Sequence, residues 1–319
     1  MTLLDDSPVR PAYRLYRATV QRVERLSPHF ARVVFGGPGF EHFGTTATDQ
    51  RIKILFPLAD GRMADIGQYD EEQWAGDWYD QWRSLPEGER NPFRTYTVRR
   101  VDSVAAELTV DFVVHHDAGP AGTWAESARG GEEVVICGPD ARSPYSSAGT
   151  DWRPANAQRV LLIGDETAVP AIGSILESLP ADRTADVFVE VPSIADVGVF
   201  EVSHPKVNVR WIARSSGGTG ERAHGEGLIE AVTEWAAAHG DVLALAAAPR
   251  PQEIVEVDID RELLWDSPEA IEGEFYAWIA GEASTIKTLR RLLVSGHGVD
   301  RRRVAFMGYW RNGVAERIG

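Results

Sequence analysis

Residues 160–167 read Val-Leu-Leu-Ile-Gly-Asp-Glu-Thr, an unbroken apolar run that ends at a glycine followed by two acids. A continuous apolar run of this length is typical of a strand buried on both faces of a sheet. Thr167 can cap the helix that follows, and Pro170 is tolerated in its first turn. The stretch therefore predicts the first strand–loop–helix unit of a parallel sheet.

The sequence after residue 167 repeats this alternation of strands and helices. Strands are expected at 186–191, 207–214, 275–281 and 304–308, and helices near 226–240 and at 284–294. Such alternation predicts a doubly wound α/β fold with a parallel sheet. The exception is 247–266, a segment rich in proline and acids, for which we expect a loop and a short helix.

The first half of the chain has a different pattern. Short strand-like segments separated by turn residues lie at 13–20, 30–35, 50–57, 94–99, 107–116 and 133–139. We predict an antiparallel β-barrel domain at 12–143, a linker at 144–157 and the α/β domain at 158–319. Within the long excursion 58–92, the spacing of Trp74, Trp78 and Trp82 favours a short helix packed on the barrel over a ligand-stacking role.

Composition narrows the function. The 319 residues include 33 Lys and Arg but 48 Asp and Glu, a formal charge of −15, which argues against nucleic-acid and anionic-membrane partners. The start of the chain has no leader pattern and no apolar run approaches about 18 residues, so we expect a cytoplasmic protein. Cys137 is the only cysteine and no histidine spacing suits a metal, so we expect no protein-bound metal and an organic redox cofactor.

Residues 94–100, Arg-Thr-Tyr-Thr-Val-Arg-Arg, form the first candidate site. Side chains alternate along a strand, so Arg94, Tyr96 and Val98 are expected on one face. Thr95, Thr97 and Arg99 are then expected on the other face. A guanidinium suits a phosphate and a tyrosine ring can lie against a flavin, whereas Thr97 would need its backbone N–H or a twisted strand end. An ordinary half-exposed strand is an equally good interpretation of these residues alone.

Three further positions suit anions. The turn at 118–125, in which Thr123 can cap a short helix, and the loops at 164–172 and 281–284 all offer N–H groups at a helix start. The last two follow parallel strands, so they lie at the sheet edge where α/β folds bind ligands. Arg214, at a strand end, can pair with the 2′-phosphate of NADPH or be a solvated surface residue, which leaves NADPH and NADH both open.

Five motifs in this order resemble the siderophore-interacting protein family. They are residues 94–99, His115 followed by 119–121 and 124–125, residues 164–171, residues 280–283 and residues 309–313. Members of that family are FAD-containing ferric-siderophore reductases within the ferredoxin-NADP⁺ reductase superfamily. The resemblance implies that the barrel binds FAD and that the α/β domain binds NADPH or NADH.

The resemblance also implies roles for individual residues. Arg94 would bind the FAD phosphates, Tyr96 would stack on the isoalloxazine and Thr97 would approach its N5 atom. Further FAD contacts would come from Thr95, Val98, His115, Gly119, Pro120, Ala121, Gly122, Thr123 and Trp124. The nicotinamide crevice would be lined by Asp165, Glu166, Thr167, Glu282 and Ala283. Lys53 matches a lysine of the siderophore pocket, and Arg311 is a weaker candidate for the same role.

The expected reaction passes a hydride from NAD(P)H to FAD and then single electrons to siderophore-bound Fe(III), which leaves as Fe(II). A flavin suits this task because it converts a two-electron donor into one-electron steps. Lys53 and Arg311 would hold an anionic ferric siderophore by local charge. A ferredoxin is an alternative electron donor, and we expect a monomer. The competing interpretations are a general NAD(P)H:flavin or ferredoxin-type reductase, and a flavin- or siderophore-binding carrier without turnover.

Overall fold

The computed structural model describes residues 10–44, 48–70, 77–114, 119–217, 220, 222–254, 257–259 and 261–313. The chain forms two compact units, one of Met1–Arg25 and Ala31–Thr150 and the other of Leu26–Phe30 and Asp151–Gly319. The limits of the linker at 144–157 stay a prediction. Among the described residues, no helix has both the length and the apolar composition needed to cross a membrane.

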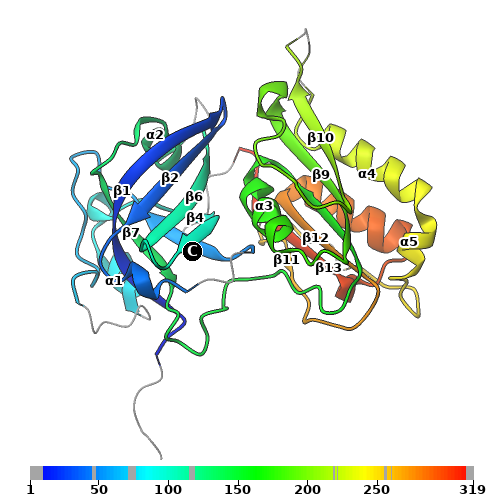
Figure 1. The fold of residues 1–319 in the computed structure, drawn as a ribbon, viewed down its shortest axis with the longest axis horizontal. Helices are drawn as coiled ribbons and strands as arrows, with labels where there is room; N and C mark the ends of the chain where they lie inside the picture. The colour runs from blue at the N-terminus through cyan, green and yellow to red at the C-terminus, as the bar shows by residue number, and fades with distance from the viewer. Residues whose placement is uncertain are drawn as a thin grey trace, which may run out of the picture. The chain divides into compact units, whose positions relative to one another are not determined.

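The first unit is built on a seven-stranded antiparallel sheet that curves into a half-barrel (Figure 1). Its strands are β1 (Tyr13–Ser27), β2 (Phe30–Gly36), β3 (Arg51–Leu55), β4 (Phe93–Thr97), β5 (Arg100–Asp102), β6 (Glu107–Val113) and β7 (Glu133–Pro139). They are ordered β4-β3-β7-β1-β2-β6-β5, so β4 is an edge strand. Two helices accompany the sheet, α1 (Trp78–Ser84) and α2 (Pro120–Ser127). The predicted antiparallel barrel is thus confirmed as a half-barrel.

The sheet of the first unit has apolar residues on both faces. One face carries an interior cluster that includes Phe35, Ile54 and Phe112. On the other face, α1 packs Trp78 and Trp82 against a second cluster of buried side chains. The predicted short helix packed on the barrel is therefore confirmed for these two tryptophans, while Trp74 lies outside the described residues. The helix covers the outer face because its tryptophans recur once per turn.

The second unit is an α/β fold with a six-stranded mixed sheet ordered β10-β9-β8-β12-β13-β11. Its strands are β8 (Arg159–Gly164), β9 (Thr184–Ser193), β10 (Val207–Ser215), β11 (Trp265–Asp266), β12 (Phe275–Glu282) and β13 (Val304–Trp310). Its helices are α3 (Val169–Ser178), α4 (Glu226–Ala238), α5 (Gly240–Ala244) and α6 (Ala283–Arg290), and α6 continues as a π-helical segment at Arg291–Gly296. Helices α4, α5 and α6 share a buried apolar cluster with one face of the sheet, and α3 lies on the other face (Figure 1).

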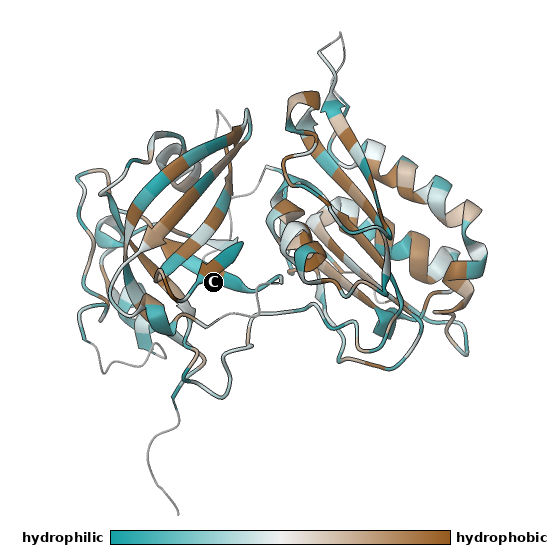
Figure 2. Ribbon diagram, viewed as in Figure 1, coloured by the Kyte–Doolittle hydropathy of each residue, from teal (hydrophilic) through white to brown (hydrophobic). Residues whose placement is uncertain are grey.

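Two details of the second unit correct the sequence-based predictions. The sheet is mixed, because the two-residue strand β11 pairs antiparallel with β13. The described part of 247–266 holds this strand and no helix, contrary to the short helix expected there. The central strands β8 and β12 are buried along their length except for Arg159, because helices cover both of their faces. Figure 2 shows hydrophobic residues, drawn in brown, within this sheet. The strand order reverses between β8 and β12, and ligands of open α/β sheets bind outside the carboxyl ends at such a point.

Candidate functional site

The register of β4 against β3 fixes which side chains of residues 93–97 share a face. Ile52 pairs with Tyr96 and Ile54 with Arg94, whereas Lys53 pairs with Thr95. Paired residues of antiparallel strands lie on the same face, so Arg94 and Tyr96 face the side of the interior cluster. Lys53 and Thr95 lie on the opposite, α1-covered side. The predicted alternation along this strand is confirmed.

Tyr96 belongs to a group of aromatic rings and is itself half-buried. Its ring centroid lies 4.4 Å from that of Phe112, which in turn lies 5.7 Å from Trp124. The buried Nε1–H of Trp124 has no hydrogen-bond partner among the described residues. A half-exposed tyrosine ring with a buried, unsatisfied donor in the same group suits a flat polar ligand.

Arg94 lies beside the start of α2. A Cβ atom built on Gly119, the N-cap residue of α2, would lie 3.8 Å from Arg94 Nη2. The guanidinium and the helix N-terminus both favour an anion, so together they suit a phosphate. The residues present in this unit thus fit a flavin nucleotide, because an arginine beside a helix start and a half-buried aromatic ring lie on the same face of the sheet. His115, the remaining member of this motif, lies outside the described residues.

The start of α2 differs from the sequence-based prediction. Thr123 was expected to cap the helix, but the cap is Gly119 and Thr123 donates its N–H to Gly119 O within the first turn. Pro120 explains the earlier start, because its fixed φ and missing N–H suit the first helical position. Ala121 is buried and Gly122 is half-buried. The four residues from Gly119 to Gly122 therefore form the helix start that approaches Arg94.

Lys53 has a well-defined setting on the outer face of the sheet. Its Nζ donates to Thr95 Oγ1 at 3.1 Å and lies 5.0 Å from the centre of the Phe93 ring. Its cross-strand neighbour Cys137 is buried, and burial raises the pKa of that thiol to about 12, so the thiol stays protonated. Thr97, buried at the end of β4, lies on this face as well. Val98 follows it and belongs to the interior cluster.

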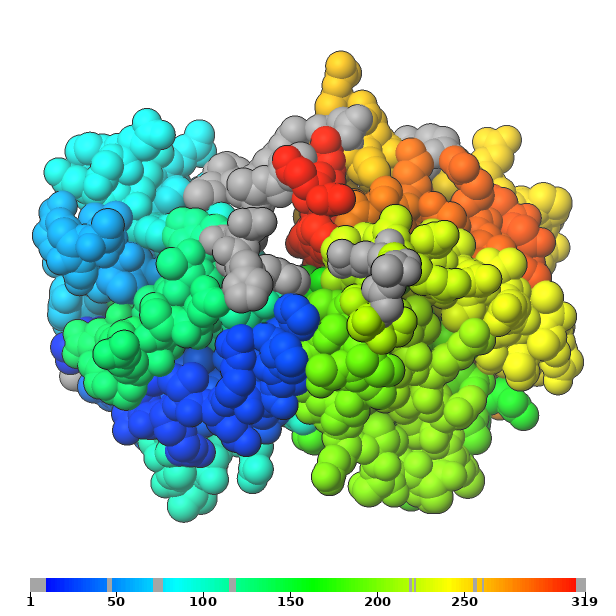
Figure 3. Space-filling view, turned by 90° about the horizontal axis from the view of Figure 1, so that it is seen from above, coloured from blue at the N-terminus to red at the C-terminus, as the bar shows by residue number. Residues whose placement is uncertain are grey.

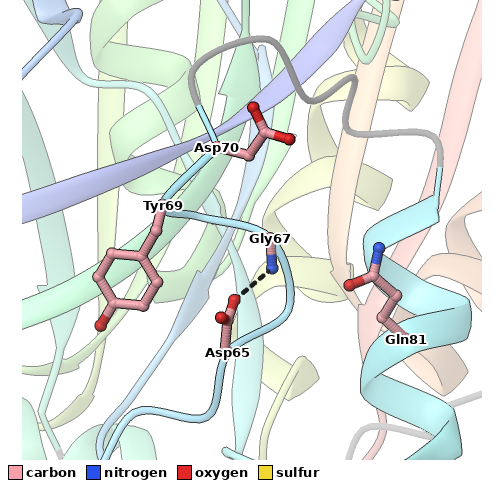
Figure 4. Close-up of a pocket in the computed structure, with 5 residues that line it drawn as sticks. All are labelled: Asp65, Gly67, Tyr69, Asp70 and Gln81. Atoms are coloured by element: carbon pink, nitrogen blue, oxygen red, sulfur yellow. Dashed lines mark hydrogen bonds between the residues drawn. The ribbon is translucent and has the colours of Figure 1, made fainter.

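A hollow next to α1 is lined by Asp65, Gly67, Tyr69, Asp70 and Gln81 (Figure 4). One carboxylate oxygen of Asp65 accepts the Gly67 N–H at 2.9 Å. Two of these five residues, Asp65 and Asp70, are acids and none is a lysine or an arginine, which disfavours an anionic ligand. The predicted site residues of the first unit lie on β3, β4 and α2 instead.

Asp165 joins three segments at the carboxyl edge of the second sheet. One of its oxygens accepts the N–H of Thr167 at 2.9 Å, and the other accepts the N–H of Glu282 at 2.7 Å and Nε1–H of Trp310 at 2.8 Å. Burial, and then the charge of Glu166, raise the pKa of Asp165 to about 7, against these hydrogen bonds. Asp165 is therefore the N-cap of the short 3-10 turn Glu166–Ala168. The N-cap of α3 itself is Ala168, and no side chain caps that helix, so the cap that the sequence suggested at Thr167 is not found there.

Arg214 occupies a buried ion-pair network. Its guanidinium donates to both carboxylate oxygens of Glu166 at 2.7 Å and to Glu190 at 3.2 Å. The side chain of Arg214 is 4% exposed and those of both glutamates are 1% exposed. The expectation of a solvated surface arginine is wrong, and the Nη atoms that would meet a 2′-phosphate are engaged. The cause is Glu190 on the neighbouring strand, which sequence analysis missed.

Glu282 caps α6. Its carboxylate accepts the N–H of Ser284 at 2.8 Å and that of Thr285 at 3.0 Å. Burial opposes its ionisation, but these bonds and the Ser284 hydroxyl hold the pKa of Glu282 below its usual range. Ala283 is buried behind it. The structure thus brings together at one edge the residues of the predicted crevice, Asp165, Glu166, Thr167, Glu282 and Ala283. Arg214 joins them through its ion pair with Glu166.

Arg311 follows β13 at the same edge of the sheet. Its Nη1 donates to the carbonyl oxygen of Ile259 at 3.0 Å, and its side chain is partly buried. In the space-filling view of Figure 3, the end of β13, drawn in red, reaches the surface of the second unit. Arg311 itself is half-buried, and one of its N–H groups is taken up by Ile259.

Comparisons with known proteins give the same description for both halves of the chain. A siderophore-interacting FAD-binding domain matches residues 19–143, and the siderophore-interacting protein family matches residues 157–313. A Mycobacterium tuberculosis protein described as uncharacterized is 33% identical over 316 residues, 95% of this chain and 93% of that protein. The ferric vibriobactin reductase of Vibrio cholerae is 28% identical over 92% of this chain and 89% of its own. A siderophore utilization protein from T. fusca is 26% identical, with 96% of each chain covered and a TM-score of 0.65.

Proposed function

The chain belongs to the siderophore-interacting protein family, and on that premise we propose that it is a ferric-siderophore reductase. Family membership and the similarity to a ferric reductase make it a siderophore-related flavin oxidoreductase. The finer proposal is that electrons pass from NADPH or NADH through FAD to siderophore-bound Fe(III). One donor molecule gives up a hydride, two ferric siderophores each take one electron, and one proton is released. We also propose that the protein acts as a monomer in the cytoplasm.

The proposal rests on the proximity of Arg94 to the start of α2. Arg94 lies on the same face of β4 as Tyr96. When bound, FAD supplies the conversion of two-electron to one-electron transfer. Arg94 and the α2 N–H groups bind its phosphates, while the ring of Tyr96 orients the flat group against the edge of the sheet. Trp124 offers the buried Nε1–H that otherwise lacks an acceptor.

Lys53 is proposed to hold the ferric siderophore. It lies on β3, on the face of the sheet opposite to Tyr96, and its Nζ reaches Thr95 of the edge strand β4, where a ligand along that edge can contact it. The ammonium group attracts an anionic chelate, and Thr95 fixes its position through the 3.1 Å hydrogen bond. Arg311 remains the weaker candidate, because Ile259 O already takes one of its N–H donors.

A turnover assay tests the proposal. The FAD-loaded protein is supplied with NADPH or NADH and a ferric catecholate siderophore, and a chelator reports Fe(II). Lys53→Ala should lower the rate with the siderophore by about tenfold or more, the size of one lost charge contact, and leave ferricyanide reduction nearly unchanged. Lys206→Ala, which removes an exposed lysine of the second unit, is the matched control.

The other outcomes separate the competing functions. Equal losses with both acceptors in Lys53→Ala would favour a general reductase without a siderophore pocket. A flavin-loaded protein that oxidises neither NADPH nor NADH with any acceptor, and takes no electrons from a reduced ferredoxin, would favour a carrier. Flavin binding itself should weaken in Arg94→Leu, because a charge-assisted phosphate contact is lost.

A further inference from the structure

The described part of 247–266 has a fixed place beside the last long strand of the second sheet. Gly308 donates its N–H to Leu264 O at 2.7 Å, and Trp265 pairs with Met307 where β11 and β13 lie side by side (Figure 1). The proposed function gives this segment no role, although its backbone is held against β13.

Trp265 and Tyr309 place a stacked pair of aromatic rings at this edge. Their ring centroids lie 5.7 Å apart with an angle of 15° between the planes, and both residues are half-buried. The fully buried ring of Trp278 lies 6.2 Å from the Tyr309 ring in an edge-on contact, so it supports the pair from within the sheet. Leu263, just before this strand, is 70% exposed and adds apolar surface. A half-exposed pair of rings with such support suits a flat aromatic group of a ligand.

Arg311 adds a positive charge next to the rings. It is the second residue after Tyr309, about 7 Å away along an extended chain, and its Nη1 is fixed by the 3.0 Å hydrogen bond to Ile259 O of the same segment. A guanidinium favours an anionic group and also stacks on aromatic faces. The rings and the guanidinium together therefore suit a ligand that is both aromatic and anionic.

The acids around these residues are paired, hydrogen-bonded or exposed. Asp266 accepts a hydrogen bond from Arg290 at 3.0 Å. Asp165 accepts the N–H at the end of β12, and Glu282 accepts the first N–H groups of α6, whose partial positive charge it offsets. The exposed charges in the described part of 257–262, which water and salt screen, are Asp258, Arg261 and Glu262. These contacts reduce the repulsion that an anion beside Arg311 would meet.

We propose that Trp265, Tyr309 and Arg311 form a surface, here called the aryl surface, that selects ferric siderophores whose iron is held by catecholate or phenolate rings. A ligand ring packs on the exposed part of the stacked pair, and the guanidinium attracts the negative charge of the chelate. Ferric trihydroxamates have neither rings nor a net charge at the iron centre, so this surface discriminates against them. Each residue of the aryl surface belongs to the second unit. The inference rests on the proposed function, in which ferric siderophores are the substrates, and names the class that this chain prefers.

Gallium complexes give a readout that is independent of turnover, because Ga(III) has the charge and nearly the size of Fe(III) but is not reduced by a flavin. The probes are gallium enterobactin, an anionic tris-catecholate, and gallium ferrichrome, a neutral trihydroxamate, each titrated calorimetrically into the FAD-loaded protein. The wild type should bind gallium enterobactin at least about tenfold more tightly than gallium ferrichrome. Equal affinities would overturn the proposal, and this comparison does not depend on the folding of a variant.

A substitution separates the aromatic contact from the charge, because Lys53 and Arg311 both favour an anion. Trp265→Leu should lower the affinity for gallium enterobactin by about tenfold, whereas Trp265→Tyr keeps a ring and should stay within about threefold of the wild type. The matched control is Trp211→Leu, which removes a half-buried tryptophan from β10, at the opposite edge of the same sheet. It should leave the affinity unchanged. An unchanged affinity in Trp265→Leu, or an equal loss in Trp211→Leu, would overturn the proposal.

The two proposals fail in different ways. Selective binding of gallium enterobactin that is lost in Trp265→Leu, in a protein that reduces no ferric siderophore, would contradict the proposed reductase and support the aryl surface. Reduction of ferric enterobactin and ferric ferrichrome, with equal affinities for their gallium complexes, would support the reductase and overturn the aryl surface.

Discussion

Replacing Arg214 by methionine should destabilise the second unit by about 3–5 kcal/mol, the usual cost of removing one partner from a buried ion pair. Arg214 contacts Glu166 through two 2.7 Å hydrogen bonds and Glu190 through one of 3.2 Å. Both glutamates are 1% exposed, so water cannot replace the lost guanidinium. Methionine has a similar length, so the loss of packing is small and the charge accounts for most of the change.

The matched control lies four residues earlier on β10. Arg210 bonds to Glu234 at 3.0 Å, but these side chains are 51% and 59% exposed, so Arg210→Met should cost only about 0–1 kcal/mol. Urea unfolding followed by circular dichroism at pH 8 gives both free energies. Equal costs for the two variants would refute the account of this network.

Three further predictions concern stability. Burial and the nearby charge raise the pKa of Asp165 to about 7, so the folded state takes up its proton before the unfolded state does. The unfolding free energy should therefore rise as pH falls from about 7 toward about 4. Asp165→Asn should lower the slope of unfolding free energy against pH by up to about 1.4 kcal/mol per pH unit. An unchanged slope in urea titrations at several pH values would contradict this. Gly281 has a φ of 150°, and a Cβ atom there would lie 2.6 Å from the Asp165 carboxylate. Gly281→Ala should therefore lower the free energy of unfolding by about 2–4 kcal/mol, as measured by thermal unfolding. Gly198→Ala, with a φ of 81° but open space around it, should cost about 1 kcal/mol, and equal costs would count against the close approach. Trp82 is buried and donates its Nε1–H to Asn91 O at 2.8 Å. In chemical denaturation, Trp82→Phe should lower the unfolding free energy by about 1–3 kcal/mol and Trp82→Ala by about 3–5 kcal/mol. Smaller losses would show that this residue does not hold α1 on the sheet.

The order of the two folds could be predicted because each imposes its own apolar pattern. Strands of the half-barrel have one face toward the interior cluster, whereas β8 and β12 are covered on both faces and are mostly apolar. The acids after β8 and within residues 281–284 could be placed at one edge, since parallel strands end on the same side. The strand β11 was missed because two residues are too short to show a period.

The partners of the buried charges could not be predicted. Glu190 meets Arg214 because β9 and β10 are neighbours in parallel register, with Ile212 opposite Glu190. A sequence does not give that register, although a glutamate within an apolar strand signals that a buried partner exists. The cap of α2 was misplaced for a local reason, because Pro120 starts the helix one turn before Thr123.

The central claim, that this chain passes electrons from a flavin to siderophore-bound iron, is tested most directly in a single turnover. The FAD-loaded protein is reduced by light under anaerobic conditions, a ferric siderophore is added, and the flavin absorbance is followed with an Fe(II) chelator present. The account predicts reoxidation of the flavin with two Fe(II) captured per flavin. A flavin that stays reduced with catecholate, hydroxamate and mixed siderophores alike would contradict it.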